Sequence, residues 1–323
     1  MNLKTDYLGI PLPHPLVIGS SSLTNDLDTV RELEDEGAAA LVLRSLYEEE
    51  IVGEQMDAFF HSDGYENSAE ASSYFPDPQL ALGPEEYLEH LHRVKQAVAI
   101  PVIASLCGTS TCSWVSYARL IEQTGANAVE LDLYHSASDA FTSAAEVENQ
   151  MIEVVQQVKH GVDIPVAAKL SPLFTAFANF ASRLDAVGVD GLVLFTRFHK
   201  VDIDIVELEV VRTATLSDSS ELQLRLRATA ALAGRVKASI AIKGGVHTAL
   251  DVVKATMAGA NVTQLVSAIL KNGPRYLRTL KAELKAWMTT YEWNSLDEMR
   301  GNMSFERIPN PAAYERATYR IFH

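Results

Sequence analysis

Eight short apolar runs are the feature of this sequence that most restricts its fold. Each run is nearly continuous in apolar residues and lacks the polar–apolar alternation of a strand with one face in water. Strands of this kind are covered on both faces, as in a parallel sheet. The runs are residues 15–20, 39–46, 101–107, 128–134, 165–171, 191–197, 239–245 and 261–267.

Stretches with helical patterning fill the gaps between these runs. They are residues 26–36, 111–124, 144–160, 176–187 and 248–258. Four of them end in glycine just before the next strand, at Gly37, Gly125, Gly188 and Gly259. Glycine adopts the left-handed conformation that ends a helix and turns the chain back. Strands alternating with helices in this way predict a single (β/α)8 barrel, in one domain over residues 1–323.

Two connections are longer than the others. They span residues 47–84 and 198–232, so each begins at the carboxyl end of a strand, the second and the sixth. Barrel active sites lie at that end, and long connections in compact domains are often functional. We therefore expect both to border the site. The tail at residues 300–323 is expected to pack on the barrel or on a partner.

Composition excludes several classes of function. The chain has 27 basic and 42 acidic residues, a net charge of −15, which disfavours nucleic acid and anionic membranes as partners. No run approaches a transmembrane length, and the first residues lack the apolar segment of a secretory signal. Cys107 and Cys112 are too few for a disulfide framework, and ordinary buried thiols are favoured over a redox pair. We expect a cytoplasmic protein that acts on a small molecule.

The strongest local signal is the glycine pair Gly244-Gly245, which ends the seventh run and precedes a helix. Glycine lets the backbone approach a ligand closely, and the start of the following helix offers free N–H groups to an anion. Ser267 and Ala268 end the eighth run. Barrels frequently bind phosphate on the loops after strands seven and eight. The pattern predicts a phosphate site, although a tight turn alone would also need the glycines.

Lys169 lies inside the fifth apolar run. An unpaired buried lysine is costly, so its side chain must reach the barrel mouth or an anionic partner. Glu130 and Asp132 share one face of the neighbouring run and can supply that partner. They could alternatively hold a metal ion, but no histidine stands at ligand spacing, and we predict no metal site.

Two further residues stand at the predicted barrel mouth. Arg44, near the end of the second run, can contact an anionic ligand or form a salt bridge with the acidic residues 48–50. His135 directly follows the fourth run. A histidine there can transfer protons near neutral pH, or serve a structural role.

The order and spacing of these motifs resemble the FMN-dependent dihydroorotate dehydrogenase family over nearly the whole chain. Residues 14–21 resemble that family's strand whose backbone lies against the flavin, and Leu43-Arg44-Ser45 is similar to its Lys-Ser pair. Glu130-Leu131-Asp132-Leu133 resembles Glu-Leu-Asn-Leu, and Ala168-Lys169-Leu170-Ser171-Pro172 resembles Val-Lys-Leu-x-Pro. Residues 243–246 and 264–268 look like its two FMN phosphate loops.

The resemblance implies an FMN-dependent oxidoreductase that converts dihydroorotate to orotate in pyrimidine biosynthesis, and we expect a homodimer. It implies His135 as the base that removes a proton, and Lys169 as the cation that stabilises reduced flavin. The FMN-binding residues that it implies are Gly19, Ser20, Ser21, Arg44, Ser45, Asp132, Lys169, Gly244, Gly245, Ser267 and Ala268.

The chain departs from the family pattern at the substrate. Asp132 replaces an asparagine, His135 replaces a cysteine, and Arg44 replaces a lysine. Residues 72–78 lack the family's asparagines, and the glycine-rich loop expected before the seventh helix is absent. Three alternatives therefore stay open. They are a flavin enzyme for another small substrate, a flavin-free barrel enzyme for a phosphorylated metabolite, and a catalytically silent relative.

Overall fold

The computed structural model describes residues 1–47, 84–107, 111–133, 140–196, 200–213 and 216–314. Eight parallel strands close into a barrel in the order β11-β12-β3-β4-β5-β6-β7-β8. They are β3 (Leu16–Ile18), β4 (Leu41–Tyr47), β5 (Val102–Cys107), β6 (Ala128–Asp132), β7 (Val166–Leu170), β8 (Gly191–Leu194), β11 (Ser239–Lys243) and β12 (Val262–Leu265). Each predicted apolar run supplies one strand, so the barrel prediction is confirmed.

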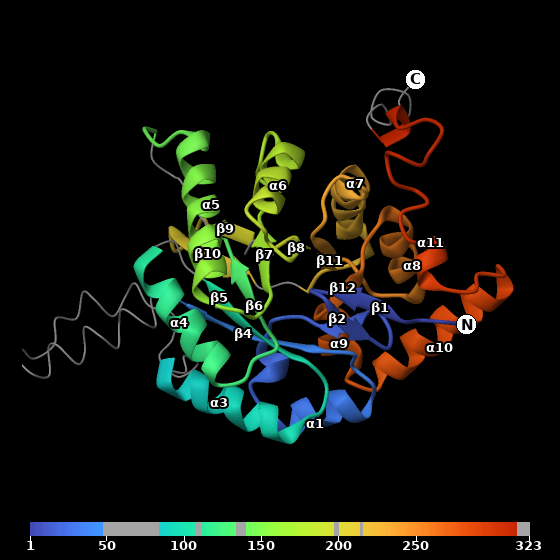
Figure 1. Ribbon diagram of the computed structural model, residues 1–323, viewed down its shortest axis with the longest axis horizontal. Helices are drawn as coiled ribbons and strands as arrows, with labels where there is room; N and C mark the ends of the chain where they lie inside the picture. The colour runs from blue at the N-terminus through green and yellow to red at the C-terminus, as the bar shows by residue number, and fades with distance from the viewer. Residues whose placement is uncertain (48–83, 108–110, 134–139, 197–199, 214–215, 315–323) are drawn as a thin grey trace, which may run out of the picture.

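Helices surround the strands (Figure 1). The larger ones are α1 (Leu27–Asp35), α3 (Pro84–Ala97), α4 (Thr111–Gln123), α5 (Ala144–Gly161), α6 (Phe177–Ala186), α7 (Leu222–Leu232), α8 (Ala249–Ala258) and α10 (Tyr276–Thr290). The predicted helical stretches correspond to α1, α4, α5, α6 and α8. Reciprocal capping boxes, Ser143 with Glu146 and Thr248 with Asp251, fix the starts of α5 and α8. No helix in the described part of the chain is long and apolar enough to cross a membrane.

The inside of the barrel is apolar at its amino-terminal end. An antiparallel hairpin, β1 (Thr5–Tyr7) with β2 (Ile10–Leu12), closes that end. Its buried side chains Tyr7, Leu8 and Leu12 pack with inward-facing strand residues such as Ala167 and Ala241. Alternate strand residues face outward and pack against the helices in a second, larger cluster. Only the carboxyl ends of the strands are therefore left to form a polar site.

The connection after β8, expected as a long loop, has secondary structure of its own. It forms the hairpin β9 (Lys200–Asp204) with β10 (Glu209–Thr213), the 3-10 turn η3 (Ser219–Glu221) and helix α7. Residues 222–227 alternate as Leu-Gln-Leu-Arg-Leu-Arg. This period of two is typical of a strand, so the sequence pattern does not indicate the helix that begins at Leu222. The connection from 47 to 84 lies almost entirely outside the described residues.

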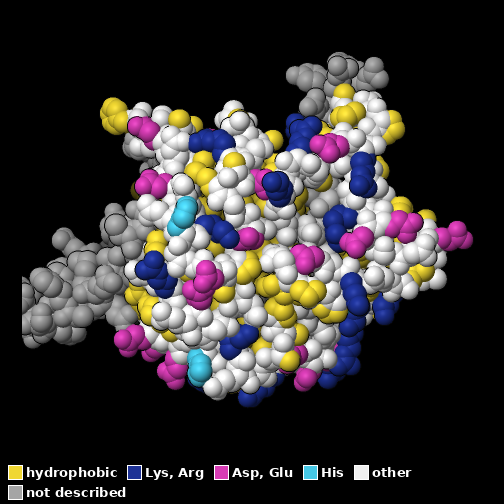
Figure 2. All heavy atoms as spheres, in the orientation of Figure 1, with side chains coloured by type: hydrophobic (Ala, Val, Ile, Leu, Met, Phe, Trp, Pro, Cys, Tyr) yellow, Lys and Arg dark blue, Asp and Glu magenta, His cyan; other side chains and the backbone are white. Residues whose placement is uncertain are grey.

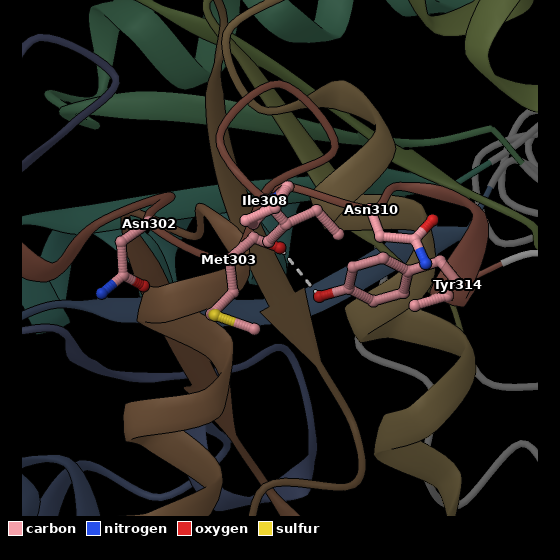
Figure 3. Close-up of a pocket in the computed structure, with 7 residues that line it drawn as sticks. Asn302, Met303, Ile308, Asn310 and Tyr314 are labelled. Carbon is pink, nitrogen blue, oxygen red and sulfur yellow. Dashed lines mark hydrogen bonds between the residues drawn. The ribbon is translucent and has the colours of Figure 1, made fainter.

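The described part of the C-terminal tail contacts the outer helices. After α11 (Leu296–Met299), the backbone of Gly301 and Met303 donates hydrogen bonds to the carbonyls of Thr256 and Met257 in α8. A surface pocket of 510 Å³ lies beside this segment, and the Tyr314 hydroxyl donates across it to the Met303 carbonyl at 2.8 Å (Figure 3). The pocket lies on the tail, in residues that belong to no barrel strand.

Acidic and basic side chains are interspersed over most of the face shown in Figure 2. This distribution follows from a chain in which 69 charged side chains, 27 basic and 42 acidic, must mostly stay in water. A few charged side chains are buried, and those inside the barrel define the candidate site.

Candidate active site

The inward faces of three barrel strands, β6, β7 and β11, change from alanine to charged residues along their length. On β6, Glu130 and Asp132 share the inward face with Ala128, because side chains on a strand alternate between its two sides. By the same alternation Lys169 on β7 and Lys243 on β11 point inward. The barrel therefore carries a layer of opposite charges at the carboxyl end of its strands, where barrel chemistry takes place.

Lys169 forms two ion pairs in this layer. Its Nζ lies 3.0 Å from Glu130 Oε1 and 2.8 Å from Asp132 Oδ2, and only 2% of its side chain is exposed. The structure thus confirms that this buried lysine is paired, and with both of the carboxylates that the sequence offered. Gln264 Nε2 donates to Glu130 Oε2 at 2.7 Å, and Thr196 Oγ1 donates to Asp132 Oδ2 at 3.2 Å.

These contacts explain the protonation states of the cluster. Burial alone would lower the pKa of Lys169, but the Asp132 and Glu130 carboxylates outweigh burial and raise that pKa above its usual range. Burial alone would raise the pKa of Glu130, yet the charges of Lys169 and Lys243 lower it below its ordinary value. Lys169 is therefore held as a cation and Glu130 as an anion at neutral pH.

Lys243 is a site residue that the sequence reasoning missed. Its Nζ donates to the carbonyl of Ser20 at 3.0 Å, across the barrel mouth. Burial, aided by the charge of Lys169, lowers the pKa of Lys243 to about 7. The period of two in the seventh run puts Lys243 on the same face as Ala241, but it does not tell which face points into the barrel.

The predicted phosphate loops meet at a small group of hydroxyls and N–H groups. The Gly245 N–H donates to Ser217 Oγ at 3.3 Å, and the Ser217 N–H donates to Ser267 Oγ at 3.1 Å. Ser217 Oγ also lies 3.2 Å from His247 Nε2. Ser217 was not predicted; it stands just before α7, where the family's glycine-rich loop was expected and not found. Its signal was the serine- and aspartate-rich run 217–220, typical of a helix start.

Both glycines of the pair have conformations that other residues rarely adopt. Their φ angles are +84° at Gly244 and +75° at Gly245. A Cβ at Gly245 would lie 2.5 Å from the backbone nitrogen of Leu222, and one at Gly244 would lie 2.8 Å from the Arg225 guanidinium. Arg225 in turn donates to the carbonyls of Lys243 and Glu221. The tight turn and the convergent donors therefore occur together.

The first strands bring serine hydroxyls to the barrel mouth. The Gly19 N–H donates to the Leu265 carbonyl at 3.0 Å, which joins this turn to β12. Ser20 Oγ lies 3.2 Å from Ser45 Oγ, linking the turn to β4. Ser21 Oγ donates to the carbonyl of Gly19 at 3.1 Å, which tightens the turn. Gly19, Ser20 and Ser21, the three residues predicted to contact flavin, thus lie in one polar segment. Lys243 donates a hydrogen bond to the Ser20 carbonyl of this segment.

The remaining predicted site residues are Arg44, Ala268 and His135. Arg44 donates to the Ser45 carbonyl at 3.2 Å, and its guanidinium lies 6.0 Å from the centre of the Tyr87 ring. Ala268 is buried in the first turn of α9 (Ser267–Asn272), next to Ser267. His135 lies outside the described residues, as does the acidic run 48–50 that was the alternative partner of Arg44.

Comparison with known proteins assigns this barrel to a family. The model of the dihydroorotate dehydrogenase family matches residues 80–288. The catalytic subunit of dihydroorotate dehydrogenase B (NAD(+)) from Thermoplasma acidophilum is 25% identical over 311 residues, which cover 93% of this chain and 98% of the relative. A putative dihydroorotate dehydrogenase A (fumarate) from Aeropyrum pernix is 29% identical over 224 residues, 68% and 72% of the two chains.

A third relative carries a different substrate in its name. The PreA subunit of the NAD-dependent dihydropyrimidine dehydrogenase of Escherichia coli K12 is 23% identical over 331 residues, 95% of this chain and 78% of the relative. The family model covers more than half of the chain, and it includes β5 to β12 with the buried charges and both predicted phosphate loops. The chain therefore belongs to the dihydroorotate dehydrogenase family and is an oxidoreductase that acts on a CH–CH bond.

Proposed function

We propose that this protein is an FMN-dependent oxidoreductase that removes hydrogen from a carbon–carbon bond of a small pyrimidine-like substrate, with dihydroorotate as the first candidate. The observation that carries the proposal is the layer of buried charges around Lys169, set beside the glycine turn at the carboxyl end of the barrel. A packed core has no need of such charges, because replacing a buried ion pair by apolar side chains is often neutral or stabilising.

The described residues fit the phosphate of FMN. Gly245, Ser217 and Ser267 bring backbone N–H groups and hydroxyls to one place, and in the structure they hydrogen-bond to one another. A phosphate accepts such donors well. Glycine at position 245 also lets the turn pass against the start of α7, where a Cβ would lie 2.5 Å from the Leu222 nitrogen. Gly244, Gly245 and Ser267 would hold the phosphate, with Ser217 as an additional donor.

The layer of buried charges fits the ring end of the cofactor. Bound FMN supplies the acceptor for hydride. Ser20 and Ser21 would back the ring, and the cations Lys169 and Lys243 would face the edge where negative charge accumulates. Asp132 Oδ1 is buried and has no hydrogen-bond partner among the described residues. This oxygen could therefore accept a hydrogen bond from an N–H group of a bound ring. Oxidised flavin and dihydropyrimidine rings both carry such N–H groups.

Asp132 also bears on the choice of substrate. A carboxylate here repels an anionic substrate by roughly a few kcal/mol at contact distance, unless its charge is neutralised. Its pairing with Lys169 at 2.8 Å provides part of that neutralisation. A neutral dihydropyrimidine would avoid the repulsion altogether. Dihydrouracil is therefore the second candidate substrate, and the buried carboxylate of Asp132 is the observation that favours it.

The test is a reductive titration of the loaded protein. We expect protein incubated with FMN and desalted to absorb at about 450 nm, and anaerobic dihydroorotate or dihydrouracil to bleach this band. His135, proposed as the base by resemblance, should be required for bleaching, so His135→Ala should keep the band and lose the bleaching.

Each outcome of this titration decides a separate point. A protein that does not retain FMN contradicts the flavin proposal. Retained FMN that neither compound bleaches contradicts the substrate class and favours a silent relative. Bleaching by dihydrouracil alone assigns the neutral substrate, and bleaching that persists in His135→Ala removes that residue from the reaction.

We also propose that the protein forms a homodimer through the hairpin β9–β10. This two-stranded sheet pairs with no other strand in the described part of the chain, and such a ribbon is only marginally stable alone. Its cross-strand pair Ile203 and Val210 is exposed, as is Leu208 at the turn with 84% of its surface in water. A second copy presents the same apolar ribbon and can cover it in an isologous contact.

Introducing charge into the apolar surface of the ribbon tests the dimer. We expect the native protein to sediment as a dimer and Ile203→Asp/Leu208→Asp to sediment as a folded monomer, because a buried carboxylate without a partner opposes association. Leu173→Asp, at another exposed leucine, is the matched control and should leave the dimer intact. A native monomer, or a double variant that still dimerises, contradicts this interface.

A further inference from the structure

The charge balance around Lys169 raises a question about which cation serves the flavin. Lys169 contacts two carboxylates, Glu130 at 3.0 Å and Asp132 at 2.8 Å, and both are buried. The three groups together therefore carry one net negative charge. A cation surrounded in this way has little attraction left for a second anion, because the field of its own partners cancels it.

Lys243 is in a different position. Its Nζ donates to a neutral group, the Ser20 carbonyl at 3.0 Å, and also interacts with the side chain of Lys169. Unlike Lys169, it forms no ion pair with a carboxylate of the described residues, so no direct partner cancels its charge. Glu130 and Asp132 face it from β6 and Lys169 faces it from β7. With Lys243 protonated, the two lysines and two carboxylates sum to zero, so Lys243 balances the acid that Asp132 adds.

We propose that Lys243, more than Lys169, supplies the positive charge that this site offers to reduced flavin. Adding two electrons and one proton to oxidised flavin leaves one net negative charge on the ring. The Lys243 ammonium would balance that charge at the Ser20 turn, while Lys169 serves mainly to keep Glu130 and Asp132 in place. The inference rests on the proposed function, since it assumes that FMN binds here.

The protonation of Lys243 agrees with this role. Burial and the neighbouring Lys169 lower its pKa to about 7 from an ordinary 10.5, so the amine exchanges its proton near neutral pH. A negative charge arriving beside it favours the protonated form, which couples reduction of the flavin to uptake of a proton. The contribution of Lys243 should therefore be largest in acid and fade in alkali.

The experiment measures the midpoint potential of bound FMN, by anaerobic titration with dithionite against a reference dye. We expect Lys243→Met to weaken binding of reduced relative to oxidised flavin by about tenfold or more, which is about 30 mV lower potential for a two-electron couple. Lys243→Arg keeps the charge and should stay near the native potential. The Met effect should be larger at about pH 6 than at about pH 9.

Asp132→Asn provides an opposite-sign control. It removes the acid that Lys243 balances, so the potential should rise, and Asp132→Asn/Lys243→Met should return toward the native value. An unchanged potential in Lys243→Met, with FMN bound, overturns the inference and leaves the proposed function standing. Failure of the native protein to bind FMN overturns both.

Discussion

Lys169→Met is expected to lower the free energy of unfolding by about 3–5 kcal/mol, the cost of breaking a buried ion pair on one side. The variant leaves Glu130, with no exposed surface, and Asp132 facing each other without the cation that separates them. Two carboxylates cannot both stay ionised in such a place, so one must take up a proton. The variant should therefore regain part of its stability as the pH falls.

Chemical denaturation of the flavin-free protein checks this result. Lys159→Met is the control. Lys159 forms an ion pair with Asp190 at 2.6 Å, but both of these side chains are partly exposed, unlike those around Lys169. That control should cost about 1 kcal/mol or less. Lys169→Met/Glu130→Gln should recover part of the loss. A cost for Lys169→Met no greater than that of the control would show that water enters the barrel and screens these charges.

Gly245→Asp is expected to weaken FMN binding by about a hundredfold or more, since a carboxylate beside a phosphate costs a few kcal/mol. The new Cβ would also lie 2.5 Å from the Leu222 nitrogen, so the turn must shift. Both effects act where Ser217 and Ser267 meet the Gly245 N–H group.

Titration with FMN, followed by quenching of its fluorescence, gives the affinity. Gly188→Asp is the control: Gly188 also has a positive φ, +86°, but a Cβ there meets nothing within 4 Å. The control carries the same backbone strain and should bind FMN normally. Equal affinities in both variants would place the phosphate elsewhere in the barrel.

Much of this architecture follows from the sequence alone. Near-continuous apolar runs of strand length, separated by helical periodicity and glycine stops, specify buried parallel strands, and all eight are present. The pairing of Lys169 also followed, because a lysine in such a run needs an anion and the adjacent run carries Glu130 and Asp132. Local rules suffice where neighbours in space are also consecutive strands in the chain.

Other features depended on the closed barrel. A strand buried on both sides has no polar face, so its sequence does not tell which residues point into the barrel. The position of Lys243 therefore depends on the pairing of β11 with β8 and β12. Ser217 likewise hydrogen-bonds to Gly245 and Ser267 because the folded barrel brings together three segments that are far apart in the sequence. The sequence by itself determined the strands, the family resemblance and the need for a buried charge pair. The tertiary structure decided which charges face one another, because barrel closure and register set those distances.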